Sequence, residues 1–169
     1  MLIGYQKYQL MRVIFHLILE NLLGGGGTIP RLRKRKLWDE LLEFQPDLTF
    51  LIIGENDIHQ GTSARALGIA IESLCKEVEA NTGGPFSCKY FGIERRSRVV
   101  GCTLDDFYKI SNSVNRFLKD SKFNAGRFES IGVKVEDLDV DGVHLKEGHI
   151  QCLFESIVAL SKDHFQNQH

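Results

Sequence analysis

Asp141 and His144 stand three positions apart in the segment Asp-Gly-Val-His. Where a loop turns into a helix, this spacing can bring both side chains to one side. The carboxylate then accepts a hydrogen bond from one imidazole nitrogen, which fixes the tautomer and leaves the other nitrogen as a general base. Apolar residues at helical spacing follow between positions 150 and 161, so we expect His144 at a loop–helix junction. Taken alone, the segment is more typical of an ordinary surface turn.

A second polar segment follows a predicted strand. Residues 48–53 form a short apolar run bounded by Pro46-Asp47 and Gly54. This pattern predicts a strand buried on both faces, as in a parallel sheet. The residues Gly-Glu-Asn-Asp follow directly, and in open α/β sheets ligands bind outside the carboxyl ends of strands. The side-chain amide of Asn56 could there donate to a developing oxyanion.

A glycine-rich segment, Gly-Gly-Gly-Gly-Thr, occupies positions 24–28. One interpretation is a flexible linker. The functional interpretation is a backbone N–H presented to an oxyanion, because no Cβ intervenes at glycine. The segment is not a P-loop, since no Gly-Lys-Thr or Gly-Lys-Ser follows it.

Gly-x-Asn-Asp after a buried strand, followed by Asp-x-x-His before a final helix, resembles the SGNH (GDSL-like) hydrolase superfamily. In that family four blocks supply Ser, Gly, Asn and His, and the glycine-rich segment sits where the Gly block should be. The resemblance extends from Gly24 to the C-terminus. Residues 24–58 are similar to the esterase domain in the first open reading frame of some LINE-type retrotransposons.

The resemblance implies hydrolysis of an acyl or acetyl ester, carried by a small molecule, a carbohydrate or a lipid. His144 would be the base and Asp141 its orienting partner, while the Asn56 amide and the Gly26 N–H would be the oxyanion donors. The family's Gly-x-Thr-like pattern points to Gly26, and Gly27 is the alternative if the register slips by one. No metal or other cofactor is expected.

The family's Gly-Asp-Ser block, which carries the nucleophile, is expected before the glycine-rich segment. No Ser precedes Ser63 and no Cys precedes Cys75. Residues 2–4 could be the remnant of a first strand and its exit turn, but Tyr5-Gln6 follows where Asp and Ser would be expected. We therefore expect either a truncated N-terminus or a decayed block, and no activity in this chain. The alternative function is a catalytically dead binding or structural module derived from a retroelement esterase.

Composition predicts one globular domain over residues 1–169, with 43% hydrophobic and 25% charged residues. A net charge of −1 gives no global attraction to nucleic acid or membrane. The four cysteines match no zinc or redox spacing, so we expect a reducing, cytoplasmic setting. Cys75 and Cys152 fall on apolar helix faces and are predicted to be core thiols.

Residues 1–23 are atypical. Lys7 and Arg12 precede the apolar residues 13–19, as in a signal peptide. His16 interrupts that run, no Ala-x-Ala site follows, and the run is too short to span a bilayer. A helix or strand of the domain is the favoured interpretation.

Two further groups, the basic run 31–36 and His59 with nearby carboxylates, can be interpreted either as ordinary surface residues or as binding sites. The basic run 31–36 could contact phosphate, but a solvated face at the start of a helix is favoured, so nucleic-acid binding would be weak and salt-sensitive. That helix is expected to continue through Leu42 until Pro46.

His59, with Asp57 and the Asp-x-x-His pair, could suggest a metal cluster. No early Asp/His block exists to complete one, so we predict a surface-loop histidine.

The remaining pattern alternates helices and strands. A helix capped by Thr62 or Ser63 is expected. Its apolar face comprises Leu67, Ala70, Ile71, Leu74, Cys75 and Val78. A strand over 89–93, a helix over 105–118 and a last strand over 131–135 follow. The inward side of the helix over 105–118 comprises Phe107, Ile110, Val114, Phe117 and Leu118.

The alternation of helices and strands predicts an α/β fold, a three-layer α/β/α sandwich with a mostly parallel sheet. The resemblance adds a flavodoxin-like order of about five strands, of which the first can be incomplete here.

Overall fold

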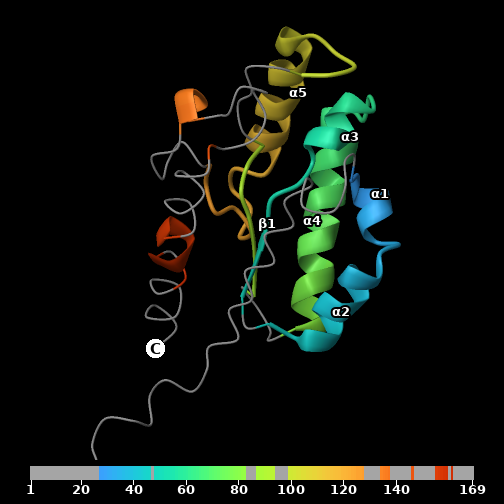
Figure 1. Ribbon diagram of the computed structural model, residues 1–169, viewed down its shortest axis with the longest axis vertical. Helices are drawn as coiled ribbons and strands as arrows, with labels where there is room; N and C mark the ends of the chain where they lie inside the picture. Colours follow the sequence, from blue (N-terminus) through green and yellow to red (C-terminus); the bar gives the residue numbers. More distant parts are fainter. Residues whose placement is uncertain are drawn as a thin grey trace, which may run out of the picture.

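The computed structural model describes residues 27–46, 48–82, 87–93, 99–127, 134–137, 146, 155–159 and 161 (Figure 1). Within them, helices and strands are mixed. In chain order they are α1 Ile29–Leu32, α2 Lys36–Phe44, β1 Thr49–Leu51, α3 Glu55–His59, α4 Ala64–Asn81, β2 Cys88–Tyr90, α5 Leu104–Phe117 and the 3-10 helix η2 Val135–Asp137. The predicted N-terminal segment 1–23 lies outside the described residues.

The two described strands pair in parallel, in a register that runs from Thr49 opposite Cys88 to Leu51 opposite Tyr90. The ladder continues one step further, where the Phe91 N–H donates to the Leu51 carbonyl at 3.0 Å. Parallel pairing requires a crossover between the strands, and α3 and α4 provide it. The predicted strand over 48–53 is confirmed, although β1 is only three residues long. The strand predicted over 89–93 is shifted, because β2 begins one residue earlier and ends at Tyr90.

A further segment runs along the other edge of β2. The Tyr90 N–H donates to the Phe123 carbonyl at 2.6 Å, and the Tyr90 carbonyl accepts from the Ala125 N–H at 2.9 Å. The Gly92 N–H then donates to the Gly126 carbonyl at 2.9 Å, so the two segments advance in the same direction. The sequence placed the next strand at 131–135 instead. Residues 131–133 lie outside the described residues, but the prediction is wrong at its end, because position 135 begins η2.

Both faces of the strands are removed from solvent. Leu51 and Tyr90 belong to the main core, with α4. Side chains alternate along a strand, so Phe50 points to the opposite face, where its ring stacks on Phe91 with centroids 5.5 Å apart. Phe50 and Phe91 are 3% and 1% exposed, which confirms the predicted burial on both faces. Figure 1 shows residues 155–159 on the side of the strands opposite α4, and Ile157 there is fully buried.

Helix α4 has the apolar face expected from the sequence. The Oγ of Ser63 caps its first turn by accepting from the Ala66 N–H at 3.4 Å. Its buried residues are Leu67, Gly68, Ile71, Leu74, Cys75 and Val78. Ala70 is only partly buried and packs against this core.

Helix α5 packs against α4, with Phe107, Val114 and Leu118 buried and Ile110 partly so. The prediction that Phe117 faces inward is wrong, because its side chain is 48% exposed. Its ring lies across Gly68 of α4, where a Cβ would be only 2.6 Å from the ring. The helix therefore buries one narrow stripe and leaves Phe117 at the edge of the contact.

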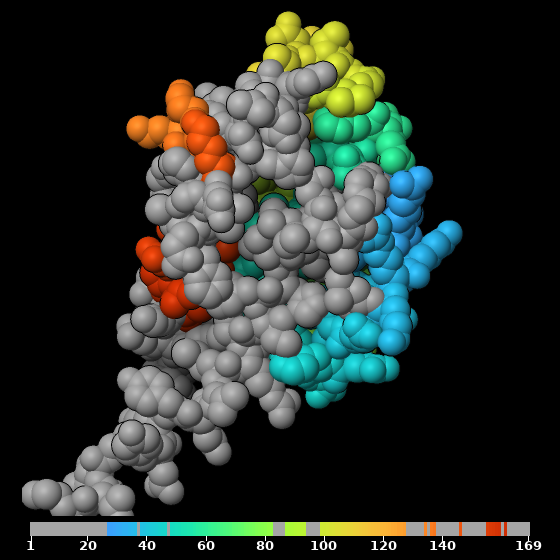
Figure 2. Space-filling model, viewed as in Figure 1, coloured from blue at the N-terminus to red at the C-terminus, as the bar shows by residue number. Residues whose placement is uncertain are grey.

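The predicted helix from Pro30 through Leu42 is two helices instead, α1 and α2, broken at residues 33–35. Leu41 is nine positions after Leu32, about two and a half turns at 3.6 residues per turn, so one straight helix would aim them in opposite directions. The break lets both enter the core, at 5% and 0% exposure. Figure 2 shows α1 and α2 together along one edge of the molecule.

Among the described residues, no helix is both long enough and apolar enough to cross a membrane.

Candidate functional site

The turn that starts the candidate site requires glycine. Gly54 ends the stretch after β1 with φ of 110° and stands at the N-cap of α3. A Cβ there would lie 3.2 Å from Cδ1 of Ile93 and 3.5 Å from Cδ1 of both Ile71 and Leu67. Glycine alone adopts this backbone conformation without strain, and it also lets the chain turn tightly over the core. The turn places Asn56 and Asp57 in the first turn of α3, just beyond the carboxyl end of β1.

Asn56 contacts the glycine-rich segment directly. Its Nδ2 donates to the carbonyl oxygen of Gly27 at 3.3 Å, and the side chain is half-buried. The two segments are separated by 29 positions in sequence, so this is a tertiary contact. It shows that the segments carrying the predicted glycine and asparagine blocks meet at the end of β1.

Asp57 makes a second contact with the same segment. Its carboxylate accepts the Ile29 N–H, with N–O distances of 3.2 and 3.3 Å to the two oxygens. Ile29 is the first residue of α1, whose own N-cap, Thr28, makes no side-chain cap bond. Asp57 is thus a cap supplied from another helix, which satisfies a backbone donor that the start of a helix leaves without an intrahelical partner.

The environment of Asp57 disfavours its charged form. The side chain is 4% exposed, and burial raises the pKa of the carboxyl group above its ordinary value. The hydrogen bonds from the Ile29 N–H and from its own N–H act in the opposite direction on that pKa, but burial outweighs them. The Asp57 carboxyl group therefore links α3 to the start of α1 in a buried position.

Three of the four predicted site residues, Gly26, Asp141 and His144, lie outside the described residues. Only the fourth, Asn56, has a described position. The hydrogen-bond geometry between Asp141 and His144, and the position of that pair relative to Asn56, therefore stay predictions.

His59 is not a surface-loop residue, and that prediction is wrong. It is the last residue of α3, is half-buried, and its ring lies 5.6 Å from the Phe107 ring at a tilt of 43°. A Cβ at Gly101 would lie 2.9 Å from the His59 carbonyl oxygen, so the chain also passes closely over it. In the described part of the chain, no group of three or more Asp, Glu, His or Cys is arranged to hold a metal ion.

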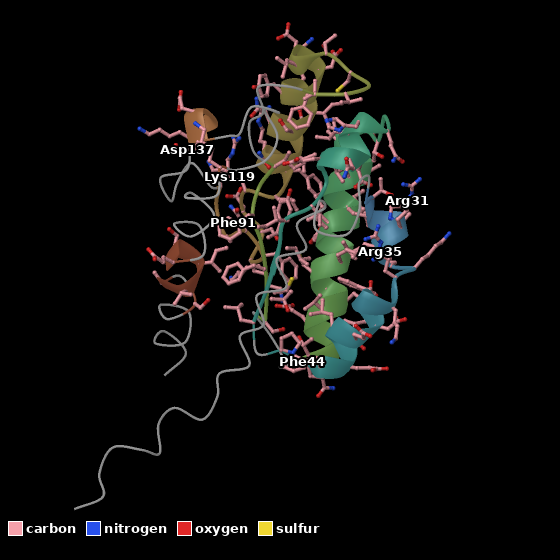
Figure 3. All side chains as sticks on the ribbon, viewed as in Figure 1. Arg31, Arg35, Phe44, Phe91, Lys119 and Asp137 are labelled. Atoms are coloured by element: carbon pink, nitrogen blue, oxygen red, sulfur yellow. The ribbon has the colours of Figure 1, made fainter. Side chains whose placement is uncertain are left out.

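The basic run at 31–36 is only partly a solvated face. Arg33 forms an ion pair with Glu77 of α4 at 3.0 Å and donates to Ser73 Oγ at 3.0 Å. It therefore ties the break between α1 and α2 to α4. Arg31 is exposed as well, and Figure 3 shows Arg31 and Arg35 on the side away from the strands. Nucleic-acid contact through this run stays a prediction.

Sequence reasoning missed the role of Asn115. Its Oδ1 accepts the Ile93 N–H and its Nδ2 donates to the Ile93 carbonyl, both at 2.9 Å. The side chain therefore satisfies the backbone just beyond β2, as a neighbouring strand would. A Cβ at Gly92 would lie 2.8 Å from this Oδ1, so glycine is needed at that position. A polar residue at the edge of the buried stripe of α5 was the available signal.

The predicted core thiol Cys75 is confirmed as a fully buried free cysteine, and Cys88 beside it on β2 is buried as well. Burial, followed by the hydrogen bond with the Cys75 thiol, raises the pKa of Cys88 well above its ordinary value. Both thiols are thus packed inside the core. Cys152, the other predicted core thiol, lies outside the described residues.

Comparison with protein-family models finds no family that matches this chain, and comparison with curated proteins finds no match either.

Proposed function

We propose that this chain is an SGNH-type ester hydrolase domain that retains the family's glycine, asparagine and Asp-x-x-His blocks and lacks the serine nucleophile. His144 is the general base, Asp141 orients it, and Asn56 donates to the oxyanion together with the N–H of Gly26 or, one register further, Gly27. The substrate class is an acyl or acetyl ester of a small molecule, a carbohydrate or a lipid.

The proposal includes the architecture. The described strands are parallel, connected by helices and buried on both faces, which supports a three-layer α/β/α sandwich with a flavodoxin-like sheet of about five strands. In such a sheet, loops that follow different strands meet at the carboxyl edge. The loop that carries Asp141 and His144 would then face the end of β1.

The observation that carries the proposal is the hydrogen bond from Asn56 to the Gly27 carbonyl, at 3.3 Å. It joins two of the four family blocks at the carboxyl end of β1. An oxyanion site needs its donors held in place before the reaction, because reorganising them would cost energy in the transition state. A bond between the two donor segments supplies that rigidity.

The chemistry needs a hydroxyl that this chain does not place in the expected block. Attack of that hydroxyl on the ester carbonyl would pass its proton to His144, and the ester's alcohol would leave with this proton as the acyl-enzyme forms. Water, deprotonated by His144, would then displace the acid and restore the hydroxyl. The sequence has no Ser before Ser63. That observation favours a second candidate, a catalytically dead module that retains the fold for binding or structure.

The test compares two proteins on an activated acetate ester. One is this chain, and the other carries an added family-type first strand with a Gly-Asp-Ser turn. We expect no turnover from the first above a His144→Ala control, and measurable turnover from the second that His144→Ala abolishes. In the extended protein, Asn56→Ala should lower kcat by about 100-fold or more, the usual loss of one oxyanion donor.

His149→Ala serves as the matched histidine control, since it lies five residues further along the chain. Folding of every variant is checked by circular dichroism and by the fluorescence of the single tryptophan, Trp38. An extended protein that folds but shows no His144-dependent turnover would refute the esterase assignment and leave the binding module. Turnover by the unextended chain that His144→Ala removes would show that a nucleophile exists elsewhere in the sequence.

A further inference from the structure

A cavity of about 150 Å³ lies beside the carboxyl end of β2. Its walls come from Tyr90 and Gly92 at the end of β2, from the end of α5 and the turn after it, and from Asn124, Gly126 and Arg127. In open α/β sheets, ligand sites lie outside the carboxyl ends of strands, so the position is typical of a binding site. Asn56 and Asp57 do not line this cavity, which separates it from the contacts made by the candidate site.

The wall of the cavity is largely carbon. Tyr90 and Leu118 contribute to it and are themselves buried, at 1% and 4% exposure. Lys119 and Arg127 line it as well, and the stems of such side chains cover apolar surface while their charged ends reach toward water. An apolar cavity of about 150 Å³ is large enough to admit a benzene molecule. The space therefore accepts a flat or compact apolar group.

The charge around the cavity has one sign. Among the described residues that line it, Lys119 and Arg127 are basic and none is acidic. Lys119, labelled in Figure 3 just past the end of α5, is exposed, and no ion pair joins it to a described carboxylate. A cation without a carboxylate partner beside an apolar cavity favours an anionic ligand.

The backbone beside the cavity is held firmly. Nη2 of Arg127 donates to the Ile93 carbonyl at 3.2 Å, and Asn115 binds both the N–H and the carbonyl of Ile93. The Gly92 N–H donates to the Gly126 carbonyl, and the Gly126 N–H in turn donates to an asparagine side chain in the same wall. These bonds keep the cavity open before any ligand arrives, which lowers the entropic cost of binding.

We propose that this cavity binds a small organic carboxylate. Its apolar body, about the size of one benzene ring, fills the space beside Tyr90 and Leu118, and its carboxylate meets the ammonium group of Lys119. The proposal goes beyond ester hydrolysis and needs neither the nucleophile nor His144.

The experiment is a titration of the isotopically labelled full chain, followed by amide chemical shifts. The probes are benzoate, which has both features, benzyl alcohol, which has the ring without the charge, and acetate, which has the charge without the ring. We expect saturable shifts from benzoate centred on Gly92, Lys119 and Gly126. Benzyl alcohol should bind about fivefold more weakly, since an exposed charge pair adds only a modest amount. Acetate should not saturate.

Variants of Lys119 test the charge. Lys119→Gln should weaken benzoate about three- to fivefold and leave benzyl alcohol unchanged, and Lys119→Glu should weaken benzoate further. Lys109→Gln is the control, because Lys109 is an exposed lysine of α5, the helix that ends just before Lys119, and it does not line the cavity. Both lysines are exposed, so neither change should unfold the chain.

Three results would overturn the proposal. Equal affinities for benzoate and benzyl alcohol would show that charge has no part in recognition. Equal effects of Lys119→Gln and Lys109→Gln would show that any charge effect is general to the surface. Benzoate shifts that fail to saturate, or that saturate away from Gly92 and Gly126, would remove the site itself.

Discussion

Removing the Asp57 side chain should destabilise the fold, because it leaves one buried backbone donor, the Ile29 N–H, without its acceptor. The Asp57 carboxylate accepts the Ile29 N–H from 28 positions away, and both residues are nearly fully buried, at 4% and 3% exposure. In Asp57→Ala no protein oxygen replaces the carboxylate in this contact. A buried donor left unsatisfied costs about 1–3 kcal/mol, and loss of a helix cap costs about 1 kcal/mol on its own. We therefore expect the free energy of unfolding to fall by about 2 kcal/mol.

Asp57→Asn should behave differently, because the amide keeps an acceptor oxygen and loses the charge. Burial raises the pKa of Asp57 above its ordinary value of 3.8, so the folded state prefers the protonated form more than the unfolded chain does. The stability that this preference contributes is fully present below the unfolded pKa, and is lost as the pH rises through the folded pKa. At pH 7 the ionised carboxylate is therefore a net cost, and Asp57→Asn should be as stable as the wild type or more so. Its advantage should shrink as the pH falls toward the unfolded value.

Urea denaturation measures these differences, with the fluorescence of Trp38 as the signal. That residue is the only tryptophan in the sequence and is 2% exposed, so unfolding changes its surroundings completely. Asp120→Ala and Asp120→Asn are the matched controls, since Asp120 is exposed and surface changes usually stay within about 0.5 kcal/mol. A change of less than about 0.5 kcal/mol in the free energy of unfolding of Asp57→Ala would contradict the role given to the carboxylate at the Ile29 N–H. An equal loss of stability in Asp57→Asn and Asp57→Ala at pH 7 would contradict the claim that an uncharged acceptor oxygen is sufficient there.

Two further stability predictions follow from local geometry, both measured by the same urea denaturation. Gly54→Ala should cost about 2–3 kcal/mol, because it combines a left-handed φ of 110° with a Cβ 3.2 Å from Ile93 Cδ1. Gly61→Ala shares the left-handed φ, at 81°, but has nothing within 4 Å, so it should cost only about 1–2 kcal/mol; equal losses would contradict the packing argument. Thr103→Ala should cost about 1 kcal/mol, because the Thr103 hydroxyl caps α5 by accepting from the Asp106 N–H at 3.1 Å. Thr103→Ser keeps that acceptor and should restore most of the stability.

Local pattern was sufficient to predict the elements whose burial follows one period. The apolar run ending at Gly54 predicted β1 and its turn, and the 3.6-residue repeat after Ser63 predicted α4 with its cap. In each of these stretches, the spacing of the apolar residues matches the buried surface of one element. The position of Asn56 just beyond β1 was predicted for the same reason, since it depends on the strand before it.

Tertiary contacts decided the features that the pattern missed. The break between α1 and α2 depends on packing both Leu32 and Leu41 under α4, which no local rule states. Phe117 lies at the exposed edge of the contact between α4 and α5, where Gly68 on the other helix leaves room for its ring. The segment at 123–126 pairs with β2 although it contains too few apolar residues to show strand alternation. Each of these outcomes involves residues far apart in the sequence.

The order of Asn56 and Asp57 explains how a short helix can hold the glycine-rich segment. Asn56 donates to the carbonyl just before Thr28, and Asp57 accepts the N–H just after it. A carboxylate at position 56 could not donate, because an ionised carboxylate is an acceptor only. The two neighbouring side chains therefore bind the backbone on both sides of Thr28 with opposite polarity, which fixes the orientation of the peptide units there. These peptide units follow Gly27, so the pair anchors the end of the glycine-rich segment to the first turn of α3.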